Sequence, residues 1–145
     1  MRRATLALLV LAWAGAAQAQ DPSACPRLPA ESGLTWEHRG TAGNDLCRAL
    51  RADGSEAFGM YISRSPAFKP KGGNREEAGV LDGREISWYR AEIAGRPGVE
   101  ARETLVTLPD GRVAHIWLQA PRDALRESLG MAQSVQFGDL RFTQN

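Results

Sequence analysis

The sequence predicts an α+β domain: an antiparallel β-sheet of three hairpins with one C-terminal amphipathic helix packed on it. Asp-Gly pairs interrupt alternating apolar runs at three places, namely Asp53-Gly54, Asp82-Gly83 and Asp110-Gly111. Asp-Gly in such a setting is a strong hairpin signal, because glycine takes a positive φ without cost. Convincing helical periodicity occurs once, after Pro121. A sheet with one apolar face needs a covering layer, and this helix supplies it.

The first nineteen residues have the pattern of a secretory signal peptide. Arg2 and Arg3 precede an apolar run over residues 4–17, and Ala17-Gln18-Ala19 is an A-x-A cleavage site. The run is shorter than the roughly 20 residues that cross a bilayer, which disfavours the alternative of a membrane anchor. We expect export, most simply to a bacterial periplasm, and no stable membrane insertion after cleavage.

The remaining residues, 20–145, are predicted to form a single domain, since about 126 residues is near the commonest domain size. Without Arg2 and Arg3 the chain carries 16 basic and 17 acidic residues. A nearly neutral domain has no global field to attract polyanions. Neither nucleic acid nor an anionic membrane is therefore favoured as a partner.

Both cysteines, Cys25 and Cys47, lie in the mature part, and an even pair in an oxidising compartment predicts a disulfide. Such a bond stabilises by roughly 3 kcal/mol in the chain-entropy model. It would hold the proline-bearing entry segment against the first long strand. A redox or metal role is the alternative, but the sequence has no C-x-x-C pair.

The apolar alternation and the turn residues divide the chain into strands and loops. A loop rich in Pro, Gly and Lys covers residues 64–74, and a short helix is possible near residues 30–33. From Pro121 onward, Leu125, Leu129, Ala132 and Val135 form one helical stripe. The predicted strands are residues 45–51, 56–63, 76–81, 85–93, 100–108 and 113–119, with residues 34–39 as a further possibility.

The closing segment, TLVTLPDGRVAHIWLQAPRDALRESLGMAQSVQF, resembles the final unit of the PsbP-like family. The shared features are a hairpin, a helix after an Ala-Pro junction, and an S-x-x-F ending, here Ser134-Val135-Gln136-Phe137. The resemblance implies a sheet flanked by helices on both faces, and a role in binding and assembly rather than catalysis. No functional residue of that family can be matched in this chain.

The third hairpin brings the candidate catalytic residues, Glu103 and His115, onto one face. If Leu108 pairs with Arg112, then His115 lies opposite Leu105, and Glu103 lies opposite Trp117 and diagonal to His115. A Glu-His pair can shuttle a proton, but a nucleophile or third group must complete the site. The alternative is a structural histidine on a sheet surface.

The sequence shows no recognisable motif for another type of catalysis or for cofactor binding. The sequence contains no G-x-S-x-G, H-E-x-x-H or glycine-rich nucleotide-binding pattern. His38 and His115 could form a metal site only if the fold brought them together. We therefore expect no cofactor and no metal.

Candidate binding residues are aromatic or basic, because exposed aromatics and mobile charged loops mark contact surfaces. We name Trp88, Trp117, Phe68, Lys69 and Lys71. For the tryptophans the alternative is the core. For the loop the alternative is a solvated connector whose charge is offset by Glu76 and Glu77.

These observations favour an exported, non-enzymatic binding or accessory protein, for example an inhibitor or immunity protein acting on an envelope protein. A small hydrolase or isomerase using Glu103 and His115 is one alternative. The other is a structural envelope protein that self-associates through an exposed sheet edge.

Overall fold

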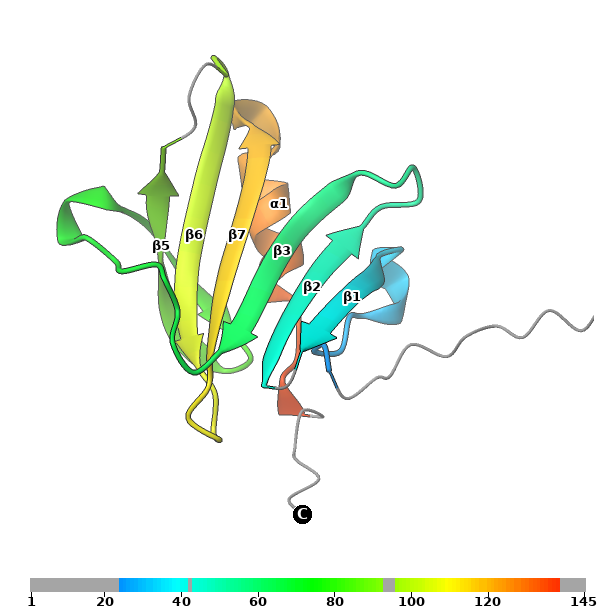
Figure 1. The fold of residues 1–145 in the computed structure, drawn as a ribbon. Helices are drawn as coiled ribbons and strands as arrows, with labels where there is room; N and C mark the ends of the chain where they lie inside the picture. The colour runs from blue at the N-terminus through cyan, green and yellow to red at the C-terminus, as the bar shows by residue number, and fades with distance from the viewer. Residues whose placement is uncertain (1–23, 42, 93–95, 139–145) are drawn as a thin grey trace, which may run out of the picture.

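The computed structural model describes residues 24–41, 43–92 and 96–138. They form a seven-stranded antiparallel sheet in the order β1-β2-β3-β7-β6-β5-β4, with α1 lying against one face (Figure 1). The predicted α+β class is confirmed, whereas the predicted signal peptide lies outside the described residues. The strands are β1 (Thr35–Thr41), β2 (Asn44–Leu50), β3 (Glu56–Ser63), β4 (Arg75–Leu81), β5 (Arg84–Ala91), β6 (Val99–Thr107) and β7 (Val113–Pro121).

The three Asp-Gly turns join β2 to β3, β4 to β5, and β6 to β7. In the middle turn Asp82 and Gly83 both have positive φ, 48° and 75°, the left-handed pair that a two-residue hairpin turn requires. The three hairpins belong to one sheet because β3 pairs with β7 from Gly59↔Trp117 to Ser63↔Val113. This pairing joins strands that are about 50 residues apart in the chain, so no local turn signal predicts it.

The helix is shorter than its sequence pattern. Pro121 is the last residue of β7 rather than the first of a helix, and the 3₁₀ turn Arg122–Ala124 leads into α1 (Leu125–Gln133). The predicted stripe is buried, including Val135, which follows the helix end. Another 3₁₀ turn, Ala30–Ser32, stands where a short helix was expected. No helix in the described ranges is long and apolar enough to cross a membrane.

The core lies between α1 and the sheet. Alternate residues of β7 are buried, with Ala114, Ile116 and Leu118 at most 1% exposed. Phe58, Met60 and Ile62 of β3 lie on the same side, since Met60 pairs with Ile116 and Ile62 with Ala114. The other face of the sheet has no helix on it within the described ranges. The second helical layer that the PsbP-like resemblance implies is therefore not seen there.

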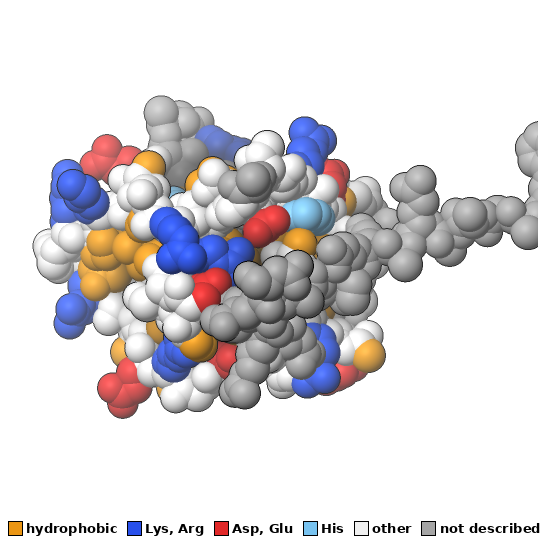
Figure 2. All heavy atoms as spheres, turned by 60° about the horizontal axis from the view of Figure 1, so that its bottom comes forward, with side chains coloured by type: hydrophobic (Ala, Val, Ile, Leu, Met, Phe, Trp, Pro, Cys, Tyr) orange, Lys and Arg blue, Asp and Glu red, His pale blue; other side chains and the backbone are white. Residues whose placement is uncertain are grey.

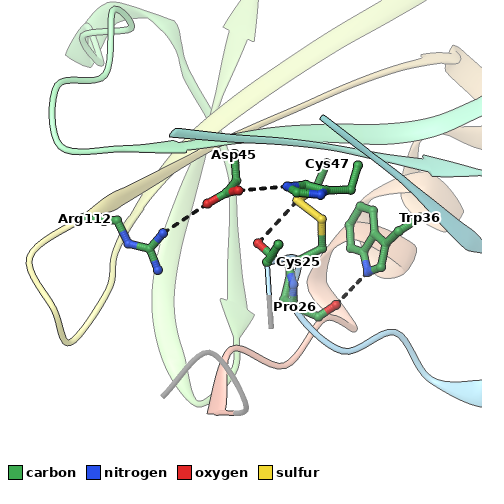
Figure 3. Close-up of a disulfide and its surroundings, with 8 residues drawn as sticks. Cys25, Pro26, Trp36, Asp45, Cys47 and Arg112 are labelled. Atoms are coloured by element: carbon green, nitrogen blue, oxygen red, sulfur yellow. Dashed lines mark hydrogen bonds and ion pairs between the residues drawn. A yellow bond between two sulfur atoms is a disulfide. The ribbon is translucent and has the colours of Figure 1, made fainter. Parts of the chain in front are cut away.

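The predicted disulfide between Cys25 and Cys47 is confirmed, with the two Cα atoms 5.9 Å apart (Figure 3). It fastens the entry segment to β2, and the indole of Trp36 on β1 donates to the carbonyl of Pro26 at 2.6 Å. The edge of the sheet and the N-terminal segment thus hold each other in place. Both sulfur-bearing residues are buried, as expected for a structural bond.

Candidate functional site

The strand register places two rows of side chains across the face that α1 does not cover. Directly opposed residues in antiparallel strands point to the same side, so each row follows from the pairing. One row contains Leu46, Tyr61, His115 and Leu105, on β2, β3, β7 and β6. The next contains Arg48, Gly59, Trp117, Glu103 and Tyr89, reaching β5. We call the surface formed by Tyr61, Phe68, Tyr89, His115 and Trp117 the aromatic face.

Trp117 lies across β3 because Gly59 leaves room for it. A Cβ atom at position 59 would come within 2.5 Å of the indole ring, so only glycine permits this contact. The indole Nε1 donates to Glu56 at 3.1 Å. The ring therefore covers β3 with its polar atom satisfied, which is the arrangement expected of an aromatic side chain at a contact surface.

Glu56 also takes part in a chain of ion pairs beside the indole. Arg48 donates to Glu56 at 2.7 Å and to Glu37 at 3.0 Å. The hydrogen bond with Glu56, followed by that with Glu37, raises the pKa of Arg48 above its ordinary value. These charges are internally paired, and the side chains are half-buried. Beyond Gly59↔Trp117 the pairing of β3 and β7 ends, and a shallow depression of about 410 Å³ lies there, lined in part by Trp117 and Glu56.

The predicted register of the third hairpin is confirmed, and it brings Glu103 and His115 together. Leu105 pairs with His115 and Glu103 with Trp117, while His115 Nε2 lies 2.9 Å from a carboxylate oxygen of Glu103. Both side chains are 20% exposed. The His115 and Trp117 rings are 5.4 Å apart between centroids.

The segment between β3 and β4 runs along this face and adds Phe68 to it (Figure 1). The Phe68 ring stacks on the His115 ring, with centroids 4.9 Å apart and an interplanar angle of 16°. The Phe68 ring also lies edge-on to the Tyr89 ring, with the two ring centroids 6.2 Å apart. Two candidate binding residues, Phe68 and Trp117, thus join the candidate catalytic pair, while Lys69 and Lys71 are exposed beside Phe68.

The arrangement can hold or pass a proton between His115 and Glu103, but an activated nucleophile is not in place. Ser63 is the serine of β3 on this side, two positions along the strand from Tyr61, the partner of His115. Its Oγ is buried and has no hydrogen-bond partner in the structure. A serine nucleophile needs a base within hydrogen-bonding reach and access to a substrate, and Ser63 has neither.

The covered face corrects the expectation that Trp88 binds a partner and rules out the alternative of a metal site at His38 and His115. Trp88 is fully buried under α1, and its indole donates to Gln133 at 2.9 Å, so the side chain is core and cannot contact a partner. His38 also lies on the covered side, because it pairs with Cys47 in register, and its Nε2 lies 2.8 Å from Asp45. Since His38 and His115 are on opposite faces, they cannot share a metal ion.

Sequence reasoning missed Tyr61, Tyr89, Arg48 and Glu56. The Asp53-Gly54 turn could have placed Arg48 and Glu56 on one side of the first hairpin. Tyr61 shares that side only because the register shifts between Ala49 and Leu50, which no turn signal predicts. Their proximity to Trp117 and His115 depends on the β3–β7 pairing, for which the sequence gives no local signal.

Comparisons with family models, with curated proteins and with solved structures found no match to this chain. The resemblance to the PsbP-like family thus stays a prediction, and the site must be interpreted from its own geometry.

Proposed function

We propose that this protein is an exported, non-enzymatic binding or accessory protein of the bacterial envelope, and that the aromatic face is its contact surface. One observation carries the proposal: five rings gather on the side of the sheet that the described residues leave without a helix. Tyr61 is 37% exposed there. Aromatic side chains are enriched in protein interfaces because they bury a large area and lose little rotamer entropy.

The polar atoms of the aromatic face favour binding over catalysis. The Trp117 indole, the His115 ring and the Glu56 carboxylate already have partners, at 3.1, 2.9 and 2.7 Å respectively. A partner that covers them would not leave a buried charge unpaired, which is the main penalty in burying polar groups at an interface. An inhibitor or immunity protein against an envelope hydrolase is the most concrete form of this proposal.

The alternative of a hydrolase or isomerase rests on the 2.9 Å contact between His115 and Glu103. The ring of Phe68 stacks on the imidazole, so a substrate would have to displace it. We therefore place the pair in the contact surface, where the carboxylate fixes the orientation of the imidazole on which Phe68 stacks.

The test is affinity capture from periplasmic extract with the mature protein as bait. Tyr61→Arg introduces a charged side chain into the aromatic face at an exposed position. Val80→Arg is the matched control, because Val80 is 58% exposed and lies on edge strand β4.

The proposal expects a specific partner that is lost with Tyr61→Arg and retained with Val80→Arg. A partner retained by both folded variants, or no partner for the wild-type protein, would contradict it.

A further inference from the structure

The segment over residues 64–75, which is the β3–β4 loop together with Arg75, the first residue of β4, carries positive charge beside the aromatic face. We call it the basic loop; its cations are Arg64, Lys69, Lys71 and Arg75. Lys69 and Lys71 are the only lysines in the sequence, and both are exposed. Neither they nor Arg75 form an ion pair with any residue that the structure describes. On the left of Figure 2, the side on which Figure 1 places the loop, basic side chains border a hydrophobic patch.

The expected neutralisation of this loop by Glu76 and Glu77 is wrong. Glu76 pairs with Arg90 at 3.1 Å, and Glu77 pairs with Arg102 at 2.7 Å. Arg102 is almost fully buried, so Glu77 is required to compensate a buried charge and is not available to the loop. The hydrogen bond with Glu77 raises the pKa of Arg102, which fixes its charge.

Asp110, whose backbone lies beside Arg64, also has its carboxylate paired with another arginine. Arg64 reaches only the backbone carbonyl of Asp110, at 3.3 Å, while the Asp110 carboxylate binds Arg112 at 2.6 Å. Lys69, Lys71 and Arg75 are thus without an ion-pair partner among the described residues, whereas arginines such as Arg48, Arg90 and Arg102 are paired within the fold. Unpaired surface charges of one sign attract a partner of the opposite sign and raise its association rate.

Phe68 connects the basic loop to the aromatic face. Its ring is stacked on His115, and the next residue in the chain is Lys69. A partner seated on the aromatic face therefore lies beside the lysines. Because the Phe68 ring is held inward by His115 and Tyr89, it is not free to insert into a lipid layer.

This inference rests on the function proposed above. We propose that the partner is a protein that presents an acidic segment to the basic loop, while apolar groups of the partner cover the aromatic face. Carboxylates of that segment pair with Lys69, Lys71 and Arg75. The ammonium groups act as point charges that tolerate several geometries, so the segment needs acidic character rather than one fixed sequence.

A direct test uses poly-L-glutamate as the acidic polypeptide, with the purified mature chain and fluorescence anisotropy as the readout. The variants are Lys69→Gln/Lys71→Gln and, as a charge-retaining version, Lys69→Arg/Lys71→Arg. The matched control, Arg122→Gln/Arg126→Gln, removes the same charge from the 3₁₀ turn and helix that follow β7.

The wild-type chain is expected to bind at about 20 mM salt and to lose affinity toward about 300 mM, as screening demands. The glutamine double variant should bind about five- to tenfold more weakly, the factor expected from two surface ion pairs. The arginine version and the control should bind like wild type. No binding by the wild-type chain, or equal binding by the glutamine variant, would overturn the inference. Binding to phosphatidylglycerol vesicles but not to polyglutamate would assign the loop to lipid instead.

Failure of this inference can be separated from failure of the proposed function. Carbodiimide coupling joins an amine directly to a carboxylate, and the chain has only two lysines and its N-terminus to offer. A captured partner that depends on Tyr61 but forms no crosslink to Lys69 or Lys71 contradicts the inference and leaves the proposed function intact. If no partner is captured, the proposed function fails, and the polyglutamate measurement still decides the chemistry of the loop.

Discussion

The two faces of the sheet are made by the same strands but differ in what they bury. On β7, Ile116 is fully buried against the core, whereas its neighbours His115 and Trp117 remain half-buried on the aromatic face. The covered face is mostly apolar, although Arg102 and Thr104 are also buried there, and its buried indole, that of Trp88, donates to Gln133 of α1. Alternation along a strand thus gives one sheet a core on one side and a row of half-buried aromatic side chains on the other.

The aromatic face pairs its charges locally, as does the covered side, where Arg102 pairs with Glu77 and His38 lies beside Asp45. Glu56 holds Arg48 and Trp117, and Glu103 holds His115. Such a surface is stable in water and can also be covered by a partner without leaving unpaired charges. We therefore expect the apolar core to contribute more to stability than the aromatic face does.

The largest expected difference is between two residues of β3. Phe58→Ala removes a fully buried ring that packs edge-on against Trp36, so we expect a loss of about 3–5 kcal/mol in the free energy of unfolding. Tyr61→Ala, on the aromatic face, should lose less than about 1 kcal/mol. Urea denaturation of both variants measures the two values. Equal losses would show that the aromatic face is part of the stabilising core.

The second effect concerns the disulfide. Reduction of the Cys25–Cys47 bond should lower stability by about 3 kcal/mol, because the unfolded chain regains the freedom of the loop that the bond closes. The fold should remain recognisable by circular dichroism, since most of the sheet follows Cys47. Mass spectrometry that finds two free thiols in the mature protein would disprove the bond itself.

A smaller effect is expected at His115. In His115→Gln an amide can still donate to Glu103, but the stack under Phe68 is weakened, so the loss should be about 1 kcal/mol. Partner binding should weaken but not disappear, because His115 is one of the five rings of the aromatic face. Complete loss of function in a folded His115→Gln protein would return the histidine to a catalytic role.

The smallest effect concerns acid stability on the covered side. Hydrogen bonds from Arg102, and then from Arg122, lower the pKa of Glu100 in the folded state. A lowered carboxyl pKa adds stability above the unfolded value of about 4.3, and this is lost as the pH falls through the folded value. Glu100→Gln should therefore flatten the pH dependence of unfolding in acid. Glu31→Gln is the control, and an identical slope for both variants would contradict the assignment.

The features that could be predicted from the sequence depend on residues close together in the chain. The Asp110-Gly111 turn fixes the register of its own hairpin, which is why the contact between Glu103 and His115 could be anticipated. The helix stripe and the disulfide follow from similarly local or compartment-based rules. The start of the helix was misplaced, because Pro121 is compatible with the end of a strand as well as with a first helical turn.

The features that could not be predicted from the sequence depend on contacts between distant segments. The joining of β3 to β7 brings Tyr61 and Gly59 to His115 and Trp117. Burial of Trp88 rather than Tyr89 depends on which face α1 covers, and the two residues are neighbours with similar side chains. The sequence also does not show that Glu76 and Glu77 pair with Arg90 and Arg102, which is why they do not neutralise the basic loop.

The central claim is that the aromatic face is the contact surface, and footprinting of the captured complex tests it most directly. Hydroxyl radicals label exposed aromatic side chains rapidly and exposed aliphatic ones more slowly, and labelling of each residue would be compared in the free and bound protein. The account predicts that Tyr61 and Trp117 are protected in the complex, while Val80 on edge strand β4 is labelled equally in both states. Protection of Val80 with unchanged labelling of Tyr61 and Trp117 would place the partner at the sheet edge and contradict the account.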